Sequence, residues 1–171
     1  MLLGTASAAY GSPDGDAWRA YEAVEEAWIR DRYELLISHA PAVLSAARLD
    51  LEIRLIDLQR RALQFRHVVV CEPALLRGGI WQLAALPLPE AENAELMRST
   101  PEYRKVTERI RNLSDALRLN SQFDRFRREQ VRLWKTPQYR EIHRRYMGRM
   151  QELQRVYSAG TVPPATTNGA H

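Results

Sequence analysis

The sequence predicts an all-α protein, a helical bundle of about five helices that forms one domain over residues 16–157. Apolar residues recur three and four positions apart through most of the chain, as on one face of a helix. Residues 42–69 contain neither glycine nor proline. With 171 residues and 45% hydrophobic content, the chain is long enough to bury one core. We expect residues 1–15 and 158–171, which show no periodicity, to be disordered.

The first helix is predicted from Asp16, a suitable N-cap residue, to about Ser38. Its apolar and aromatic positions are spaced by three, four or seven, which indicates one buried face. The residues predicted on this inward face are Trp18, Tyr21, Val24, Trp28 and Leu35.

The second helix is predicted from Ala42, just after Pro41, to about Val69. Leu49, Leu51 and Ile53 alternate as in a strand, but a helical stripe fits the longer segment. The stripe consists of Leu44, Leu51, Leu55, Leu58, Ala62 and Phe65. Further apolar residues widen this face, so we expect the second helix to be central and contacted on two sides.

A Gly/Pro-rich connector is predicted at residues 73–89. Pro73 disfavours a helical residue before it and so ends the second helix. The connector's apolar residues are Ile80, Trp81, Leu83 and Leu86. We expect them to form one or two helical turns over the core, or an exposed flap that marks a partner site.

A short motif, Thr-Pro-x-Tyr-Arg, begins at Thr100 and again at Thr136. Threonine suits the N-cap and proline the first helical position, so both copies predict helix starts. Ser121 and Asp124 resemble a capping box and predict a third start. From Glu90 to about Tyr157 the chain is therefore expected to be helical. The apolar stripes there are Tyr103, Val106, Ile110, Leu113 and Leu117; Phe123, Phe126 and Trp134; and Tyr139, Ile142, Tyr146, Met150, Leu153 and Tyr157.

Charge is unevenly distributed along the chain. Residues 1–100 carry 10 basic and 14 acidic side chains, whereas residues 101–171 carry 15 basic and 7 acidic ones. Nearly all the cations are arginines, which suit forked contacts with phosphate or carboxylate, although a compositional bias of the genome has the same effect. Arg104, Arg111, Arg118, Arg125 and Arg132 recur every seven residues and would form a ladder on one continuous helix. Acidic residues four positions after Arg104, Arg111 and Arg125 predict local neutralisation instead.

The least compensated cations predict an anion- or partner-binding surface. Its residues are Arg127, Arg128, Arg132, Lys135, Arg144 and Arg149. They lie near aromatic residues, including Trp134 and Tyr146. Our first hypothesis is a non-enzymatic interaction protein, an adaptor or regulatory subunit, whose arginine-rich half binds an acidic protein partner or a second copy of the chain. The alternative is a nucleic-acid-binding protein that uses residues 125–149.

A third hypothesis comes from a resemblance. Residues 49–66, LDLEIRLIDLQRRALQFR, resemble the first long helix of all-helical chorismate mutases. This resemblance implies a bundle enzyme that acts on an anionic metabolite. The lysine that the family places further along is absent, since VVVCEP stands there, so no catalytic residue is assigned. Residues 96–113 resemble helical bacterial regulators of the YlbF kind, which implies a regulatory adaptor.

The sequence offers no cofactor or metal motif. His67 and Cys71 are four residues apart, but a structural zinc site needs four ligands, and Cys71 is the only cysteine. We therefore predict neither a cofactor nor a metal, and no membrane span. The predicted location is cytoplasmic. The alternative is export, if the N-terminal segment MLLGTASAAYG is a truncated signal peptide.

Overall fold

The computed structural model describes residues 13–71 and 88–158, which form six α-helices, one short 3-10 helix and no strand. The helices are α2 (Pro13–His39), η1 (Pro41–Val43), α3 (Leu44–Cys71), α5 (Glu90–Ser99), α6 (Pro101–Arg118), α7 (Phe123–Leu133) and α8 (Pro137–Ser158). The prediction of an all-α helical bundle is confirmed.

The predictions for residues 1–12, for the connector with Ile80, Trp81, Leu83 and Leu86, and for residues 159–171 lie outside the described residues. The first helix begins at Pro13, earlier than predicted, because proline suits the first turn.

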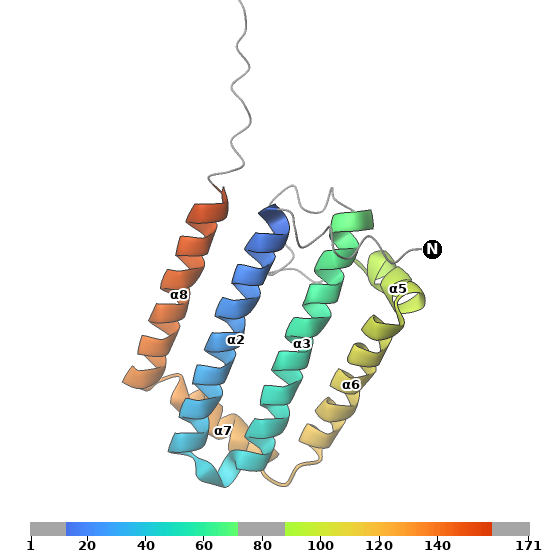
Figure 1. Ribbon diagram of the computed structural model, residues 1–171. Helices are drawn as coiled ribbons and strands as arrows, with labels where there is room; N and C mark the ends of the chain where they lie inside the picture. The colour runs from blue at the N-terminus through green and yellow to red at the C-terminus, as the bar shows by residue number, and fades with distance from the viewer. Residues whose placement is uncertain (1–12, 72–87, 159–171) are drawn as a thin grey trace, which may run out of the picture.

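The four long helices lie in a row rather than in a closed ring. In Figure 1, α8, α2, α3 and α6 stand side by side in that order, and α7 crosses one end of the row. Packing follows the same order: α8 packs on α2, α2 on α3, and α3 on α6. α3 is therefore contacted on two sides, as its wide apolar face predicted.

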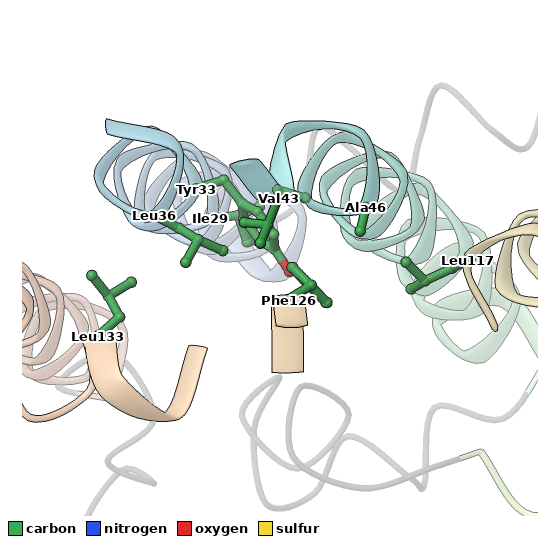
Figure 2. Packing of buried hydrophobic residues seen from close by; sticks show 9 residues of the cluster. Ile29, Tyr33, Leu36, Val43, Ala46, Leu117, Phe126 and Leu133 are labelled. Atoms are coloured by element: carbon green, nitrogen blue, oxygen red, sulfur yellow. The ribbon is translucent and has the colours of Figure 1, made fainter. Parts of the chain in front are cut away.

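The core has three parts along this row. At one end of the α2–α3 pair, the rings of Trp18 and Phe65 stack with centroids 4.7 Å apart. A second part joins α3 to α5 and α6 around Tyr103, which is fully buried. The third part closes the opposite end of α2–α3. There Phe126 of α7 points toward Ile29, Tyr33 and Val43 (Figure 2). Burial of such apolar and aromatic surface stabilises the bundle.

The predicted inward face of the first helix is only partly correct. Trp18 and Tyr21 are buried, but Val24, Trp28 and Leu35 are half-buried. The buried residues of the second half of α2 are instead Ile29, Tyr33 and Leu36. The reason is that α2 lies between two helices. The ring of Trp28 stacks on Tyr146 of α8, at 4.7 Å between centroids, while Ile29 and Tyr33 face the core shared with α3 and α7.

The two copies of the Thr-Pro motif both start helices, but only one threonine acts as a cap. Thr136 Oγ1 accepts a hydrogen bond from Tyr139 N at 3.2 Å. Thr100 occupies the N-cap position of α6 as predicted, but the expected hydrogen bond is absent, because its side chain makes no cap contact. Thr100 directly follows α5, and its backbone N–H donates to Leu96 O at 3.0 Å, so that helix sets its orientation.

The predicted capping box at Ser121 is also wrong. α7 begins at Phe123 and follows Gln122, which has no side-chain cap hydrogen bond. Instead, Gln122 Oε1 accepts a hydrogen bond from Ser45 N of α3 at 3.1 Å. Asn120 Oδ1 accepts another from Gln122 N at 2.9 Å. The turn between α6 and α7 is thus fixed by contacts with α3.

This turn breaks the predicted arginine ladder. α6 ends at Arg118 and α7 begins at Phe123, so the five arginines belong to two helices with different directions. The predicted pairs four residues apart also differ. Asp115 pairs with Arg118 at 3.5 Å and Glu129 with Arg132 at 2.7 Å. Trp134, predicted on an apolar stripe, is 51% exposed because α7 ends just before it.

Candidate functional site

Four of the six predicted site residues lie on or just after one short helix. We define the α7 outer face as Asp124, Arg127, Arg128, Val131, Arg132, Trp134 and Lys135. The first five line an open surface depression. Their spacing of three and four residues puts them on one side of α7, whereas Phe126 and Leu133 point into the core. α7 is amphipathic, with its apolar side against the bundle and its cations outward.

The cations of the α7 outer face are only partly neutralised. Arg132 pairs with Glu129 at 2.7 Å, and the Arg127 guanidinium lies 5.9 Å from the centroid of the Phe123 ring. Arg128 and Lys135 form no ion pair with a carboxylate in the described part of the chain. Val131 is 48% exposed, so apolar side chains lie among these cations. The surface therefore combines positive charge with exposed apolar area.

The other two predicted residues, Arg144 and Arg149, lie elsewhere. Arg144 makes a forked contact with Glu141 one turn earlier on α8, with nitrogen–oxygen distances of 2.9 and 3.0 Å. Arg149 lines a small hollow between α8 and α2, together with Asp31 and Arg145. The depression at α7 is lined by α7 residues alone. The structure thus divides the predicted surface into separate parts.

A second candidate site, which was not predicted from the sequence, is a hollow between α2 and α3. Its volume is about 210 Å³. Its lining consists of Glu25, Trp28, Ile29, Arg32, Arg54, Asp57, Leu58 and Arg61. We call it the α2–α3 cavity. It brings three guanidinium groups and two carboxylates next to one aromatic and two aliphatic side chains.

At one end of the α2–α3 cavity, two arginines converge on a buried Tyr–Asp pair. The Tyr33 hydroxyl donates a hydrogen bond to Asp50, which is only 6% exposed. Arg32 donates to the Tyr33 hydroxyl oxygen at 3.2 Å, and Arg54 Nε lies 3.7 Å from Asp50 Oδ1. Gln130 of α7 also donates to Asp50, at 3.2 Å. Burial, with the nearby charge of Asp50, raises the pKa of Tyr33 to about 12.

At the other end, charges are balanced within the chain. Arg60 and Arg61 both pair with Asp57, at 2.6 and 3.1 Å, and Arg61 also donates to the Tyr21 hydroxyl at 3.3 Å. Glu25 accepts a hydrogen bond from the Tyr146 hydroxyl at 2.7 Å. Burial, followed by the charge of Glu25, raises the pKa of Tyr21 to about 12. This end of the cavity therefore has little excess charge.

A signal for this cavity exists in the sequence. Glu25 and Arg32 are seven residues apart, as are Arg54 and Arg61. Residues seven positions apart lie on the same side of a helix, two turns apart. Where two antiparallel helices pack together, these sides face each other across the interface. Residues 49–66 resemble an enzyme helix, but nothing in that resemblance connects the segment to Glu25 and Arg32. Only the pairing of α2 with α3 makes the connection.

The remaining chemistry in the described residues is limited. His67 is half-buried and Cys71 exposed, and no group of three or more metal-ligating side chains is present in the part that the structure describes. None of the helices described there is both long and apolar enough to cross a membrane. The chain matches no protein-family model, no curated protein and no solved structure.

Proposed function

We propose that the protein is a helical adaptor or regulatory subunit that binds an acidic protein segment on the α7 outer face. The observation that carries this proposal is the exposure of Val131, which lies among partly unneutralised cations, and of Trp134, which directly follows α7. Tryptophan and arginine are the residues that most often dominate the binding energy of protein interfaces. The fitting partner is amphipathic, with carboxylates for Arg127, Arg128 and Lys135 and apolar side chains for Val131 and Trp134.

The geometry favours a protein partner over nucleic acid. α7 has 11 residues, which corresponds to a length of roughly 16 Å. A phosphate backbone needs a continuous positive track, but Arg144 and Arg149 lie apart from α7, and Asp124 adds a negative charge to the depression. An aliphatic residue such as Val131 is also better matched by a protein side chain than by a phosphate.

The charge distribution favours a different partner over a second copy of the chain. The acidic helix α2 already lies between α3 and α8. There Glu25 bonds to Tyr146, and Asp31 lies in the same small hollow as Arg145 and Arg149. The acidic N-terminal half therefore complements the basic C-terminal half within one molecule, and less of it remains to recruit another copy.

The test uses defined probes rather than an unknown partner. A fluorescent peptide of glutamate and leucine, with the leucines at helical spacing, is titrated with the protein and followed by anisotropy. A peptide with glutamine in place of glutamate, and mixed-sequence single-stranded DNA and RNA, are titrated in parallel. We expect the acidic peptide to bind, and Val131→Asp or Trp134→Ala to weaken binding roughly tenfold.

The matched control is Arg111→Ala, an exposed arginine on α6, and we expect it to leave peptide binding unchanged. Equal binding of the glutamine peptide would remove the role of charge and contradict the proposal. Tighter binding of DNA or RNA, with an affinity that falls steeply with salt, would replace it with the nucleic-acid alternative. Equal weakening of binding by Arg111→Ala and Trp134→Ala would show that the α7 outer face is not the specific binding site, and it would also contradict the proposal.

A further inference from the structure

We propose that the α2–α3 cavity is a binding site for a small organic monoanion, a carboxylate attached to an apolar body. The carboxylate is held by Arg32 and Arg54, and the apolar body lies against Trp28, Ile29 and Leu58. This inference does not depend on the α7 outer face, which lies on a different helix. It assigns a ligand class to a site in which the protein does not supply a carboxylate partner for every guanidinium group.

The positive charge at one end of the cavity exceeds the negative charge. The carboxylate at this end is that of Asp50, and of the two arginines only Arg54 pairs with it. Asp50 already accepts hydrogen bonds from Tyr33 and Gln130, and Arg54 Nε approaches it only to 3.7 Å, beyond hydrogen-bonding distance. Arg32 forms no ion pair with a carboxylate in the described residues, and its polar contact there is with the Tyr33 hydroxyl. Two guanidinium groups thus retain donors for an added anion.

Arg32 is also held in place for binding. Its guanidinium lies 5.4 Å from the centroid of the Trp28 ring and 5.0 Å from that of Tyr33. Stacking of this kind fixes the plane of a guanidinium and leaves its edge free for the forked contact that carboxylates favour. Arg54 keeps 52% of its side chain exposed, so it stands at the solvent edge of the cavity. A ligand carboxylate entering from solvent reaches both groups.

The opposite end of the cavity determines the rest of the ligand. Asp57 pairs with both Arg60 and Arg61, and Glu25 is bonded to Tyr146. The lining carries three guanidinium groups and two carboxylates. Asp50 and Arg60, which pair with lining residues, bring the count to four guanidinium groups and three carboxylates, an excess of one positive charge. A second negative charge on the ligand would meet Glu25 or Asp57. The apolar wall of Ile29 and Leu58 instead favours an aromatic or branched aliphatic group there.

The size of the cavity sets an upper limit on the ligand. Its volume of about 210 Å³ is below the range of ~300–1,000 Å³ that is typical of pockets for drug-sized ligands. Both walls are long helices, so the binding groups are positioned by rigid elements. A purely structural network would be expected to match Arg32 with a carboxylate, because guanidinium groups removed from water without a partner are costly.

The experiment measures binding of defined carboxylates to the full chain. 3-Phenylpropionate and 4-methylpentanoate are titrated by calorimetry, each beside its neutral amide of the same shape. We expect the carboxylates to bind and the amides to bind at least roughly tenfold more weakly, as charge-assisted hydrogen bonds require. Arg32→Gln and Arg54→Gln are each expected to reduce carboxylate affinity by a similar factor.

The matched control is Arg30→Gln. Arg30 lies on the same helix, pairs with Glu26 at 2.6 Å and lines a different hollow, so its loss should leave affinity unchanged. The indole N–H resonance of Trp28, assigned with Trp28→Phe, provides a readout in the wild-type chain. We expect it to shift on addition of 3-phenylpropionate. This readout keeps the test decisive if a variant fails to fold.

Three outcomes would overturn the proposal. The first is no binding of either carboxylate together with an unmoved Trp28 resonance. The second is equal affinity for acid and amide, which would mean that the arginines do not recognise charge. The third is binding that Arg32→Gln and Arg54→Gln leave intact, which would place the ligand elsewhere. None of these outcomes bears on peptide binding at the α7 outer face, so the two proposals fail independently.

Discussion

The hydroxyl group of Tyr33 on α2 donates a hydrogen bond to the buried carboxylate of Asp50 on α3. The two residues are 17 positions apart, on opposite sides of the turn at η1. Gln130 of α7 reaches the same carboxylate, so three helices meet at one polar group inside an apolar cluster. A buried carboxylate with several donors is stable only while each partner is present. This arrangement therefore links the register of α2 and α3 to the docking of α7.

The buried tyrosines predict a loss of stability in alkali. An unfolded tyrosine ionises near pH ~10, whereas folded Tyr21 and Tyr33 each have a pKa of about 12. Between these values the folded chain binds more protons than the unfolded chain, so the free energy of unfolding falls as pH rises. The stabilisation is complete below pH ~10 and is lost as pH approaches 12, by roughly 1–3 kcal/mol for each tyrosine.

Urea unfolding at a series of alkaline pH values measures this slope. The variant Tyr21→Phe/Tyr33→Phe is expected to start from a lower stability at neutral pH, because it loses buried hydrogen bonds. Its stability should then decline less steeply than that of the wild type. Equal slopes for the two chains would show that these hydroxyl groups do not carry the pH dependence.

The helices were predictable from sequence because their signals are local. The wide apolar face of residues 44–65 predicted a central α3, and this follows from periodicity alone. Which side of α2 is buried could not be predicted in the same way. Trp28 and Ile29 are adjacent and both apolar, and which of them faces the core depends on α8, which returns to pack on α2 from more than 100 residues later.

The candidate sites, too, were predictable only where their residues lie close together in the sequence. Arg127, Arg128 and Arg132 lie within two turns of one helix, so their common face could be predicted. Arg149 could not be placed with them, because the turns between α6 and α8 redirect the chain. The α2–α3 cavity exists because the packing of α2 on α3 places Arg32 and Arg54, from different helices, in the lining of one hollow. The seven-residue spacings on each helix are visible in the sequence, but the register that brings Arg32 and Arg54 to one hollow is not.

The repeated motif offers a matched pair of tyrosines with different roles. Tyr103 is fully buried, and its hydroxyl accepts a hydrogen bond from Gln64 at 2.8 Å and donates one to Asn93 at 2.6 Å. Tyr139 is half-buried and stacks on His143. Tyr103→Phe leaves two polar partners unsatisfied and is expected to lower the free energy of unfolding by about 1–3 kcal/mol. Tyr139→Phe should cost less than about 0.5 kcal/mol.

Thermal and urea unfolding of both tyrosine variants provide the measurement. The comparison is controlled, because the two substitutions remove the same atom from the same sequence motif. Similar losses in the two variants would show that the bridge from α3 through Tyr103 to α5 contributes little.

The threonines of the motif form a second matched pair. Thr136 caps α8 through Tyr139 N, whereas Thr100 makes no such bond before α6. Thr136→Ala is expected to destabilise the protein by about 1 kcal/mol, the usual cost of a lost N-cap. Thr100→Ala should cost less than about 0.5 kcal/mol. Chemical denaturation of the two variants measures the two losses in the free energy of unfolding. A larger loss for Thr100→Ala than for Thr136→Ala would contradict the capping assignment.

The docking of α8 depends on few specific contacts, since no residue of this helix whose burial is described is fully buried. Its polar link to α2 is the hydrogen bond from Tyr146 to Glu25, at 2.7 Å, beside the stacked ring of Trp28. A double-mutant cycle with Tyr146→Phe and Glu25→Ala is expected to give a coupling energy of about 1 kcal/mol, as for a partly buried bond to a charged group. Amide hydrogen exchange across α8 should accelerate in both single variants, because local opening of a helix requires only the loss of its docking contacts.

The control cycle pairs Tyr146→Phe with Glu152→Ala, an exposed residue that pairs with Arg155 on the same helix, and should show no coupling. Equal coupling in both cycles would mean that the Tyr146–Glu25 bond has no specific part in holding α8 against α2.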